Sequence, residues 1–353
     1  MGGSDKHKRT ANRRLFFTML SFTLVTTVFN EIRRLDQTIA DIEAQTNKPD
    51  EIIIADAGSR DGTLERLEKW KKESSLNIVV FVLPGCNIAE GRNEAIRRSR
   101  NELIVSTDFG CRYKPAWLES LIKPFSNPDV RVVGGAFSII KEEVNTVAAK
   151  ADFVLQNGYP VVMDSFFSVS SRSIAYYRSV WQEVGGYLEW LTLAADDTIF
   201  WRMILQKKIR YELVDEPNVS WLRHKTFKAF SKEAFRYGLG DGESLINFRN
   251  MQSHVFETTM RYAFFLVLLL LPLILVSGFF VWSIALIPLS FGLRSYRNAW
   301  RNWKQMDYNF GVLLACFRLI EMSRIQYLKG FCKGWLFPSS AQLEGRKSLT
   351  AIR

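Results

Sequence analysis

The stretch that decides the fold is EIIIADAGSRDGT, residues Glu51–Thr63. Its first half is a continuous apolar run, which is typical of a strand buried on both faces of a parallel sheet. An aspartate, two glycines and other turn-forming residues follow at once, and residues 63–72 continue with a helical pattern. A buried strand that turns directly into a helix indicates an α/β fold.

The same strand–helix rhythm extends outward from this stretch. We expect strands at residues 22–28, 51–55, 77–82, 102–106 and 130–136, and helices at 35–43, 63–72, 90–98 and 116–125. The alternation predicts a central, mostly parallel sheet with helices on both faces. Further on we expect helices at 141–156, 178–184 and 228–237, strands at 167–175, 210–214 and 218–222, and one helix that begins at Asp196.

The composition limits the possible classes of protein. The chain has 353 residues, 47% of them hydrophobic, which is enough for one large domain or two. Its net charge of +11 suits phosphate-bearing substrates or anionic lipid. Aromatic residues are not interleaved with the basic ones, so we expect no nucleic-acid partner. The four widely spaced cysteines and three histidines form no zinc motif. The cysteines are typical of free thiols in a reducing compartment.

The two ends of the chain differ from its middle. Residues 1–20 are basic, and the apolar run Leu15–Phe29 is interrupted by Ser and Thr without a cleavage site, so we expect no signal peptide. Tyr262–Leu293 carries no charge. As one helix it would span roughly 48 Å at 1.5 Å per residue, against a hydrocarbon core of about 30 Å. We predict a transmembrane or re-entrant hairpin in residues 251–309 and an interfacial amphipathic helix within residues 310–353.

The expected hairpin turns near Ser277-Gly278. Arginines at both of its ends favour placing both ends on the cytoplasmic side of the membrane. A single span, with the residues from Arg294 onward outside, is the alternative.

Three polar segments follow predicted strands, at the edge where open α/β sheets bind ligands. They are Phe29–Glu31, Asp56–Thr63 and Thr107–Cys111. An acid at this edge can accept from the base or ribose of a nucleotide, and Asp108 can ligate Mg²⁺ or Mn²⁺. Each of these acids can equally be a turn or cap residue. Arg92, near the start of a predicted helix, is either solvated or in contact with the base or phosphate of a nucleotide.

Two adjacent acids, Asp196 and Asp197, open another predicted helix. Aspartate is favoured there because its oxygens accept from unpaired backbone N–H groups and its charge suits the helix dipole. A carboxylate beside a ligand-binding sheet can also serve as a general base. The pair alone leaves both interpretations open.

Taken together, these segments resemble one family. The motifs Val25–Glu31, Asp56–Thr63, Gly91–Asn93, Thr107–Cys111 and Asp196-Asp197 have the order and spacing found in family 2 glycosyltransferases with the GT-A fold. The resemblance covers about residues 20–245, together with a membrane tail that many bacterial members carry.

The resemblance implies roles for particular residues. Asp56 is similar to the family's first nucleotide-binding aspartate, and Asp108 to the first residue of its Asp-x-Asp metal motif. Asp197 is similar to the catalytic base, with Asp196 beside it. The implied nucleotide-sugar site comprises Thr27, Phe29, Glu31, Asp56, Ser59, Asp61, Arg92, Asp108 and Arg236. The implied acceptor side comprises Gly186, Tyr187, Trp190 and Trp221, near the segment 170–175.

Two positions depart from the family's pattern. Gly110 stands where the second aspartate of Asp-x-Asp would be, which leaves an Asp-x-Gly-Cys variant with a single carboxylate. Glu233–Tyr237 resembles the Gln-x-x-Arg-Trp motif of processive members, with Glu and Tyr substituted. Single transfer is therefore favoured over processive polymerisation.

The expected protein is an inverting glycosyltransferase whose GT-A domain spans residues 21–250. Its donor is a UDP- or GDP-linked sugar, its cofactor Mg²⁺ or Mn²⁺, and its acceptor a lipid-linked or cell-envelope glycan. With membrane lipids as a further partner, we expect it at the cell inner membrane with a cytoplasmic catalytic domain. The alternatives are a nucleotidyltransferase, for which a Gly-rich phosphate loop with a lysine is missing, and a catalytically inactive nucleotide-binding membrane scaffold.

Overall fold

The computed structural model describes residues 20–163, 167–271 and 279–349. Their contacts group them into two compact units. The sheet unit consists of the described residues up to Ile140 together with Val161–Leu222. The helical unit consists of Lys141–Pro160 and the described residues from Arg223 onward. Each unit is considered by itself below.

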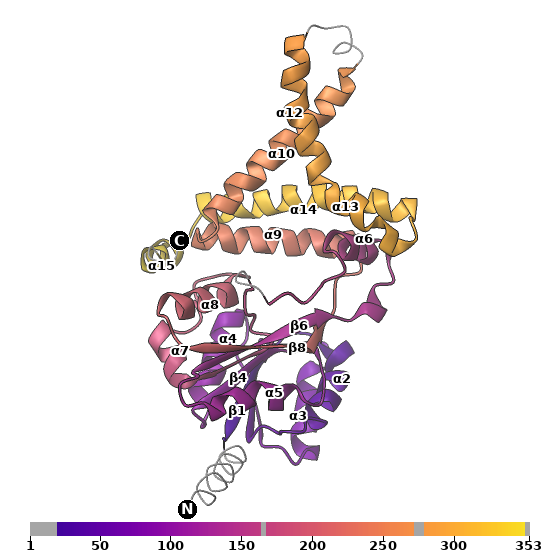
Figure 1. Cartoon of the computed structure of the whole chain (residues 1–353). Coiled ribbons are helices and arrows are strands. Elements are labelled where there is room, and N and C mark those ends of the chain that lie inside the picture. Colours follow the sequence, from indigo (N-terminus) through magenta and orange to yellow (C-terminus); the bar gives the residue numbers. More distant parts are fainter. Residues whose placement is uncertain (1–19, 164–166, 272–278, 350–353) are drawn as a thin grey trace, which may run out of the picture. The chain divides into compact units, whose positions relative to one another are not determined.

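The sheet unit is built on one mixed sheet (Figure 1), in the order β3-β2-β1-β4-β7-β6-β8-β5. The strands are β1 Phe22–Val28, β2 Glu51–Asp56, β3 Ile78–Val82, β4 Leu103–Asp108, β5 Arg112–Tyr113, β6 Val132–Ile139, β7 Ile174–Tyr177 and β8 Tyr211–Trp221. Strands β3, β2, β1 and β4 run parallel. The predicted α/β class is confirmed, but the sheet is mixed rather than mostly parallel, because β7 lies antiparallel between β4 and β6 and β5 antiparallel beside β8.

Two hydrophobic cores lie on the two faces of this sheet, because neighbouring side chains of a strand point to opposite faces. Within β2, Ile52 and Ile54 belong to one core and Ile53 to the other. The first core includes side chains from α2 Ile32–Glu43, α3 Thr63–Glu73 and α5 Trp117–Ile122. The second includes side chains from α4 Ile88–Arg98, α7 Arg178–Val184 and α8 Asp196–Gln206. The parallel half of the sheet is therefore covered on both faces, as its apolar runs predict.

Beyond β6 the predicted elements need correction. The expected helix at 141–156 is a 3₁₀ turn, Lys141–Glu143, followed by α6 Val147–Leu155, since Thr146 accepts from the Ala149 N–H and caps a new helix start. The expected strands at 210–214 and 218–222 are one strand, β8, whose pairing with β6 shifts register between Gly135 and Phe137. The shift lies where β8 carries Pro217, which cannot donate to the ladder.

The helical unit pairs two long helices at very close range. It comprises α6, α9 Phe227–Ser244, α10 Phe248–Leu269, α12 Phe279–Ser295, α13 Arg297–Asn302, α14 Phe310–Leu336 and α15 Ser340–Ser348. A Cβ on Gly238 or Gly242 of α9 would lie 2.0 or 2.2 Å from a carbonyl oxygen of α14. The same holds in reverse for Gly330 and Gly334 of α14, where a Cβ would lie 2.1 and 2.5 Å from α9 carbonyl oxygens. This is the small-xxx-small spacing that lets two helix backbones touch.

The excursion 141–160 belongs to the helical unit through its apolar packing. Ala148, Ala151 and Val154 of α6 lie in one hydrophobic cluster with Val312 and Cys316 of α14. The Asn302 side chain donates to the Val154 carbonyl oxygen at 3.0 Å and fixes the end of α6 to the α13 region.

Helices α10 and α12 pack against each other, with the Phe256 and Phe291 rings 5.2 Å apart and Phe264 against Gly292 (Figure 1). Among the described residues, no helix has both the length and the apolar character needed to cross a membrane. The predicted turn at Ser277-Gly278 and the basic residues 1–19 lie outside the described residues.

Candidate functional site

Helix α4 places the central cation of the site. Its start is fixed by a capping box, in which the Asn87 side chain accepts from the Glu90 N–H and the Glu90 side chain from the Asn87 N–H. Gly91 allows the helix to lie close to the sheet, because a Cβ there would be 2.9 Å from the Thr27 Cγ2. The next residue, Arg92, is thereby buried near the carboxyl end of β4.

Arg92 joins two carboxylates. Its guanidinium donates from Nη1 to Asp196 Oδ2 at 2.6 Å and from Nη2 to Asp108 Oδ1 at 2.9 Å, and lies 4.7 Å from the centroid of the Tyr187 ring. The residue is 2% exposed. Arg92 is therefore buried between two carboxylates and not solvated, and its predicted contact with the base or phosphate of a nucleotide stays a prediction.

The aspartate pair occupies the first turn of α8, after Ala195 in the left-handed conformation with φ 75°. A non-glycine residue in that region costs on the order of 1–2 kcal/mol and signals that the surroundings impose the turn. Burial raises the pKa of Asp196 to about 6, against the lowering effect of the Arg92 guanidinium. Asp197 is half-buried and accepts from the Ser170 hydroxyl at 3.0 Å and from the Thr198 N–H at 2.8 Å. The two adjacent carboxylates thus have different environments.

Asp108 ends β4 with its side chain 37% exposed. One oxygen accepts from Arg92, and the other lies 3.9 Å from Arg172 Nε. Two residues on, Gly110 has φ +90°, and a Cβ at that position would lie 3.1 Å from Glu31 Oε2. A second aspartate at Gly110 would therefore combine a strained backbone with repulsion from Glu31, which gives a physical reason for the glycine.

Within the described part of the chain, no three His, Cys, Asp or Glu side chains gather to hold a metal ion. Mg²⁺ commonly binds through one or two carboxylates together with the phosphates of its substrate. Asp108 has one partly exposed carboxylate. It therefore fits an ion that is bound mainly by the phosphates of a diphosphate ligand and by a single carboxylate of the protein.

Asp56 is the last residue of β2, and its side chain holds the loop that follows. It is fully buried, and its Oδ1 accepts from the Gly58 and Ser59 N–H groups, both at 2.7 Å. Its Oδ2 is buried without a hydrogen-bond partner. A carboxylate oxygen without a partner is costly unless a ligand supplies a donor, so Oδ2 indicates a binding position.

The other residues of the predicted nucleotide site meet at the β1 and β2 loops. The Ser59 hydroxyl accepts from the Asn30 N–H at 2.9 Å. The Asp61 carboxylate accepts from the Ile32 N–H and from Thr63, and these bonds lower its pKa. Asp61 therefore ties the two loops together with both of its oxygens.

Three residues beside these loops differ in exposure. Thr27 is half-buried beneath α4, and Phe29 is 58% exposed at the end of β1. Burial raises the pKa of Glu31, against the lowering effect of Arg34. Phe29 is thus the open apolar surface at this edge.

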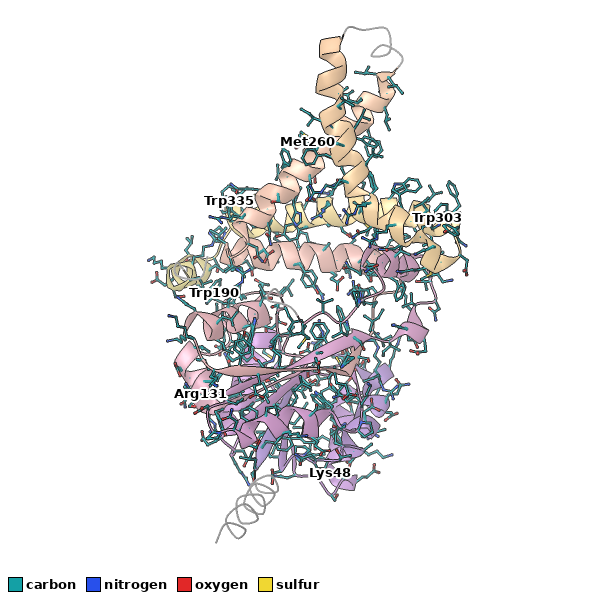
Figure 2. The ribbon with its side chains drawn as sticks, in the orientation of Figure 1. Lys48, Arg131, Trp190, Met260, Trp303 and Trp335 are labelled. Atoms are coloured by element: carbon teal, nitrogen blue, oxygen red, sulfur yellow. The ribbon has the colours of Figure 1, made fainter. Side chains whose placement is uncertain are left out.

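The predicted acceptor segment lines a cavity of about 520 Å³ in the sheet unit. Its lining comprises Asn93, Arg97, Trp181, Gln182, Gly185, Gly186, Tyr187, Leu188, Glu189 and Trp190. Tyr187 is 2% exposed and stacked on Phe200, so its ring supports the site from the core rather than facing an acceptor. Trp190, labelled in Figure 2, is half-buried at this cavity.

Asn93 holds this segment and was not among the predicted site residues. Its Nδ2 donates to the Tyr187 carbonyl oxygen and to Glu189 Oε1, both at 2.8 Å. Its Oδ1 accepts from Trp181 Nε1 at 2.8 Å and from the Tyr187 N–H at 3.0 Å. Every polar direction of a buried amide is used, which makes Asn93 a positioning residue.

Ser170 and Arg172 are also brought into the site, although the sequence indicated only their segment. The signal that could have found their position is the glycine pair of β6. A Cβ on Gly135 would lie 2.1 Å from the Ser173 hydroxyl, and one on Gly134 would lie 2.4 Å from Val169. The glycines let the segment 169–173 lie directly against β6.

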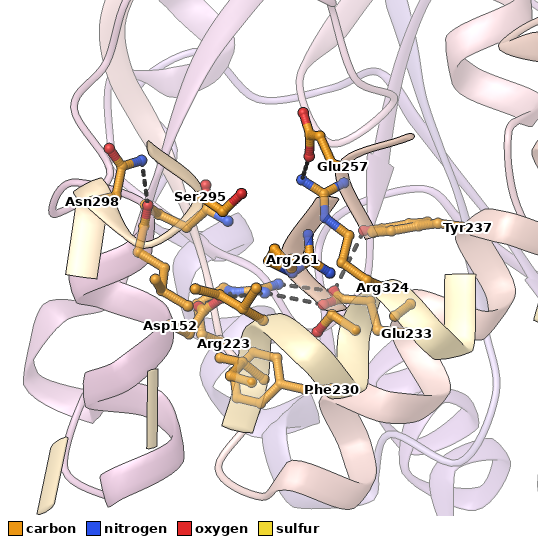
Figure 3. Close-up of a pocket in the computed structure, with 16 residues that line it drawn as sticks. Asp152, Arg223, Phe230, Glu233, Tyr237, Glu257, Arg261, Ser295, Asn298 and Arg324 are labelled. Carbon is orange, nitrogen blue, oxygen red and sulfur yellow. Dashed lines mark hydrogen bonds and ion pairs between the residues drawn. The ribbon is translucent and has the colours of Figure 1, made fainter. Parts of the chain in front are cut away.

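Arg236 lies in the helical unit, exposed on α9. In the same motif, Glu233 accepts from Arg223 at 2.8 Å, and Arg223 also donates to Asp152 at 2.9 Å. Figure 3 shows this charge network at the wall of a second cavity, of about 360 Å³, which lies wholly within the helical unit. The Glu in place of the family's Gln therefore has a local partner in Arg223.

The sequence profile of the family described as Glycosyl transferase family 2 matches residues 23–209. Over 116 residues the chain is 29% identical to an uncharacterized glycosyltransferase, YfnE, of Bacillus subtilis (strain 168), and the match covers 33% of this chain and 29% of that protein. It is also 29% identical to a cholesterol galactosyltransferase of Borreliella burgdorferi over 117 residues, or 33% of this chain and 32% of that one. The match thus spans about a third of the length of these two relatives.

Among solved structures, the chain is similar to a mannosyltransferase of Pyrobaculum calidifontis in complex with GDP-Man and Mn²⁺, at 13% identity and a TM-score of 0.49, covering 98% of this chain and 94% of that one. It is similar to S. aureus TarS in complex with UDP-GlcNAc, at 13% identity and a TM-score of 0.48, covering 90% of each chain.

The family profile runs from β1 to just beyond α8, with the excursion 141–160 inside it, and includes Asp56, Asp108 and the Asp196-Asp197 pair. The α/β fold with its mixed sheet resembles that of GT-A glycosyltransferases. The chain belongs to glycosyl transferase family 2.

Proposed function

We propose that the protein is an inverting glycosyltransferase that moves a sugar from a UDP- or GDP-linked donor to an acceptor hydroxyl. The observation that carries the proposal is a row of groups across three neighbouring strands. Asp56 of β2 pairs in register with Val28 of β1, and Thr27 of β1 with Asp108 of β4. With strands about 4.8 Å apart, the two aspartates lie about 10 Å apart along the ligand-binding edge. A nucleoside diphosphate bridges such a distance, with its nucleoside at Asp56 and its diphosphate at Asp108.

In the proposed reaction, Asp197 acts as the general base. It accepts the proton of the acceptor hydroxyl while the acceptor oxygen forms a bond to C1 of the sugar. The bond from C1 to the diphosphate oxygen breaks, and its electron pair leaves with the nucleoside diphosphate. This single displacement inverts C1 and requires one base. The Ser170 hydroxyl orients the carboxylate by donating to its Oδ2.

We propose that the Asp-x-Gly-Cys segment makes Asp108 the protein's one carboxylate for a divalent ion, Mg²⁺ or Mn²⁺, that arrives with the donor. The ion would neutralise charge on the departing diphosphate. Arg92 holds Asp108 through Oδ1, and the Asp108 side chain is partly exposed.

The exchange Asp56→Asn tests the donor site. Asparagine retains a carbonyl oxygen for the Gly58 and Ser59 N–H groups but presents an amide NH₂ where Oδ2 now has no partner. A hydrogen-bond donor of the nucleotide would then face the N–H groups of the asparagine side chain. We therefore expect affinity for the matching UDP or GDP to fall about tenfold or more. Calorimetric titration measures this loss, with thermal unfolding as a check that the loop is intact.

Two results would contradict the donor-site proposal. Equal nucleotide affinity in the variant would remove Asp56 from the site. If the wild type binds neither UDP nor GDP, with or without Mn²⁺, the proposed donor site is refuted. Nucleotide binding without any transfer would favour the inactive nucleotide-binding scaffold. Transfer of a nucleotidyl group instead of a sugar, seen by mass spectrometry of the products, would identify a nucleotidyltransferase.

We further propose that the protein works at a membrane, on the cytoplasmic side of the cell inner membrane, with a lipid-linked or envelope glycan as acceptor. Large apolar side chains of α10 and α12 are exposed, among them Leu266 at 55%, Leu269 at 77% and Ile287 at 55%. Such surface, flanked by basic residues, suits an interfacial anchor. Trp303 and Trp335, near the two ends of α14 in Figure 2, belong to the residue type enriched at lipid headgroups.

Flotation with lipid vesicles tests this proposal. We expect the protein to float with phosphatidylglycerol vesicles, and less with phosphatidylcholine alone, because its net charge of +11 favours anionic lipid. The pair Leu266→Asp and Leu269→Asp should abolish flotation without lowering the thermal midpoint, since both side chains are exposed. Flotation that persists in this variant would place the anchor elsewhere.

A further inference from the structure

Arg172 is a second guanidinium of the site and shares Asp108 with the buried Arg92. Its guanidinium carbon is 4.1 Å from the centroid of the Trp221 ring and 5.7 Å from that of Phe137. Cation–π contacts of this kind hold a guanidinium in a fixed plane. The side chain is 21% exposed, so it reaches the solvent-facing side of the site while its stem is packed.

The proposed diphosphate end of the donor site and the proposed base both lie beside this side chain. Arg172 Nε is 3.9 Å from Asp108 Oδ2, the proposed diphosphate end of the donor site. Arg172 Nη1 donates to the Ser170 hydroxyl at 3.0 Å, and that hydroxyl donates to Asp197 Oδ2 at 3.0 Å. The guanidinium therefore stands between the position where the diphosphate leaves and the position of the proposed base.

The backbone around Arg172 is held as firmly as its side chain. The Thr107 hydroxyl donates to the Arg172 carbonyl oxygen at 2.9 Å, which ties the loop to the end of β4. Gly134 and Gly135 supply the space in which the neighbouring residues lie. A cation held by strand, loop and aromatic ring is preorganised, which is the condition for strong electrostatic stabilisation of a developing charge.

The two guanidiniums at Asp108 differ in whether an anion from solvent can reach them. Gly110 removes one carboxylate from the pattern of the family, and Arg92 is already bound to two carboxylates. Arg172 is the second guanidinium at Asp108 and, unlike Arg92, it is partly exposed. A planar guanidinium matches two phosphate oxygens with two parallel N–H bonds.

We propose that Arg172 is a catalytic residue that binds the donor diphosphate directly and stabilises it as it departs. The assignment rests on the proposed function and adds a cation that belongs to this chain. When the C1–O bond breaks, the electron pair passes to the diphosphate oxygen, and the Arg172 N–H groups donate to the oxygens on which that charge collects. The proton of the acceptor goes to Asp197, so Arg172 gains and loses no proton.

Nucleotide binding gives a readout that does not depend on turnover. We expect Arg172→Gln to lower affinity for UDP or GDP about tenfold or more, because a charge-assisted contact to the second phosphate is lost. Affinity for UMP or GMP should change less than threefold, since these ligands lack that phosphate. Arg172→Lys should be intermediate, because it keeps the charge and loses the planar fork. Calorimetric titrations are run with Mn²⁺ and again with EDTA.

Arg131→Gln is the matched control. Arg131 is a partly exposed arginine of the same unit, and its ion-pair partner is Glu183, at 2.9 Å, and not a residue of the site. It should leave both affinities unchanged. Equal losses for UDP and UMP, or a loss that appears only with Mn²⁺, would overturn the assignment. A wild type that binds no nucleotide would instead refute the proposed function, so the two failures are distinguishable.

Discussion

The Asp197→Asn variant is expected to lose transfer activity by a factor of about 10²–10⁴, the usual contribution of a general base. The structure supports this choice within the pair, because Asp197 is half-buried and oriented by Ser170, whereas Asp196 is bound to a buried guanidinium. Asparagine can still occupy the first turn of α8, so the free energy of unfolding should fall by only about 0.5–1.5 kcal/mol. Initial rates at saturating donor and thermal unfolding measure the two quantities.

The neighbouring exchange, Asp196→Asn, is the matched control. It removes a charge from the partner of Arg92, so its effect should appear mainly in stability and less in turnover. Near wild-type turnover in Asp197→Asn would remove that residue from the mechanism. Equal losses of turnover in both variants, at equal stability, would contradict the separate roles.

The Arg92→Met variant is expected to lose about 3–5 kcal/mol of unfolding free energy. Breaking a buried ion pair from one side leaves the other charge without compensation, and Asp196 is such a charge. Arg98→Met is the control on the same helix, because the Arg98 side chain is 46% exposed and its ion pair with Glu94 should contribute about 0–1 kcal/mol. Chemical denaturation of the two variants gives the comparison.

The loss in Arg92→Met should also depend on pH, in a direction that follows from Asp196. In the wild type, burial raises the pKa of Asp196 to about 6, so the folded protein holds that proton more tightly than the unfolded chain and this carboxyl contributes less stability as pH rises toward 6. Without Arg92 the group that lowers this pKa is gone, so the pH range over which this stability is lost extends to higher pH. The deficit should therefore be largest near pH 8 and smaller near pH 5. A deficit independent of pH would contradict this account.

The parallel half of the sheet could be predicted because its signals are local. The apolar runs of β1 and β2 and the turn residues after them are read along the chain, and the predicted strand 22–28 is confirmed as Phe22–Val28. The antiparallel half carried weaker signals. Strand β5 has two residues, too few for any periodicity, and β7 begins at Ile174 because the preceding segment lies over the β6 glycines instead of pairing.

The candidate site also has one part that could be predicted from the sequence and another that could not. Acids at strand ends mark the ligand edge of an α/β sheet, which is why Asp56 and Asp108 could be named from the sequence. The burial of Arg92 could not, because its partner Asp196 is more than a hundred positions away and only tertiary packing brings them together. The glycine spacing of α9 and α14 was visible in the sequence, but it becomes a contact only when the two helices are seen to face each other.

The course of residues 141–160 matters to anyone who wishes to shorten this protein. The chain leaves the sheet unit after Ile140, contributes α6 to the helical unit and returns at Val161. A protein ended after Leu222 would retain α6 with Ala148, Ala151 and Val154 uncovered, since their partners in α14 would be gone. Exposed apolar surface of that kind favours aggregation. A fragment that comprises the sheet unit alone therefore needs two excisions, the replacement of 141–160 by a linker as well as removal of everything after 222.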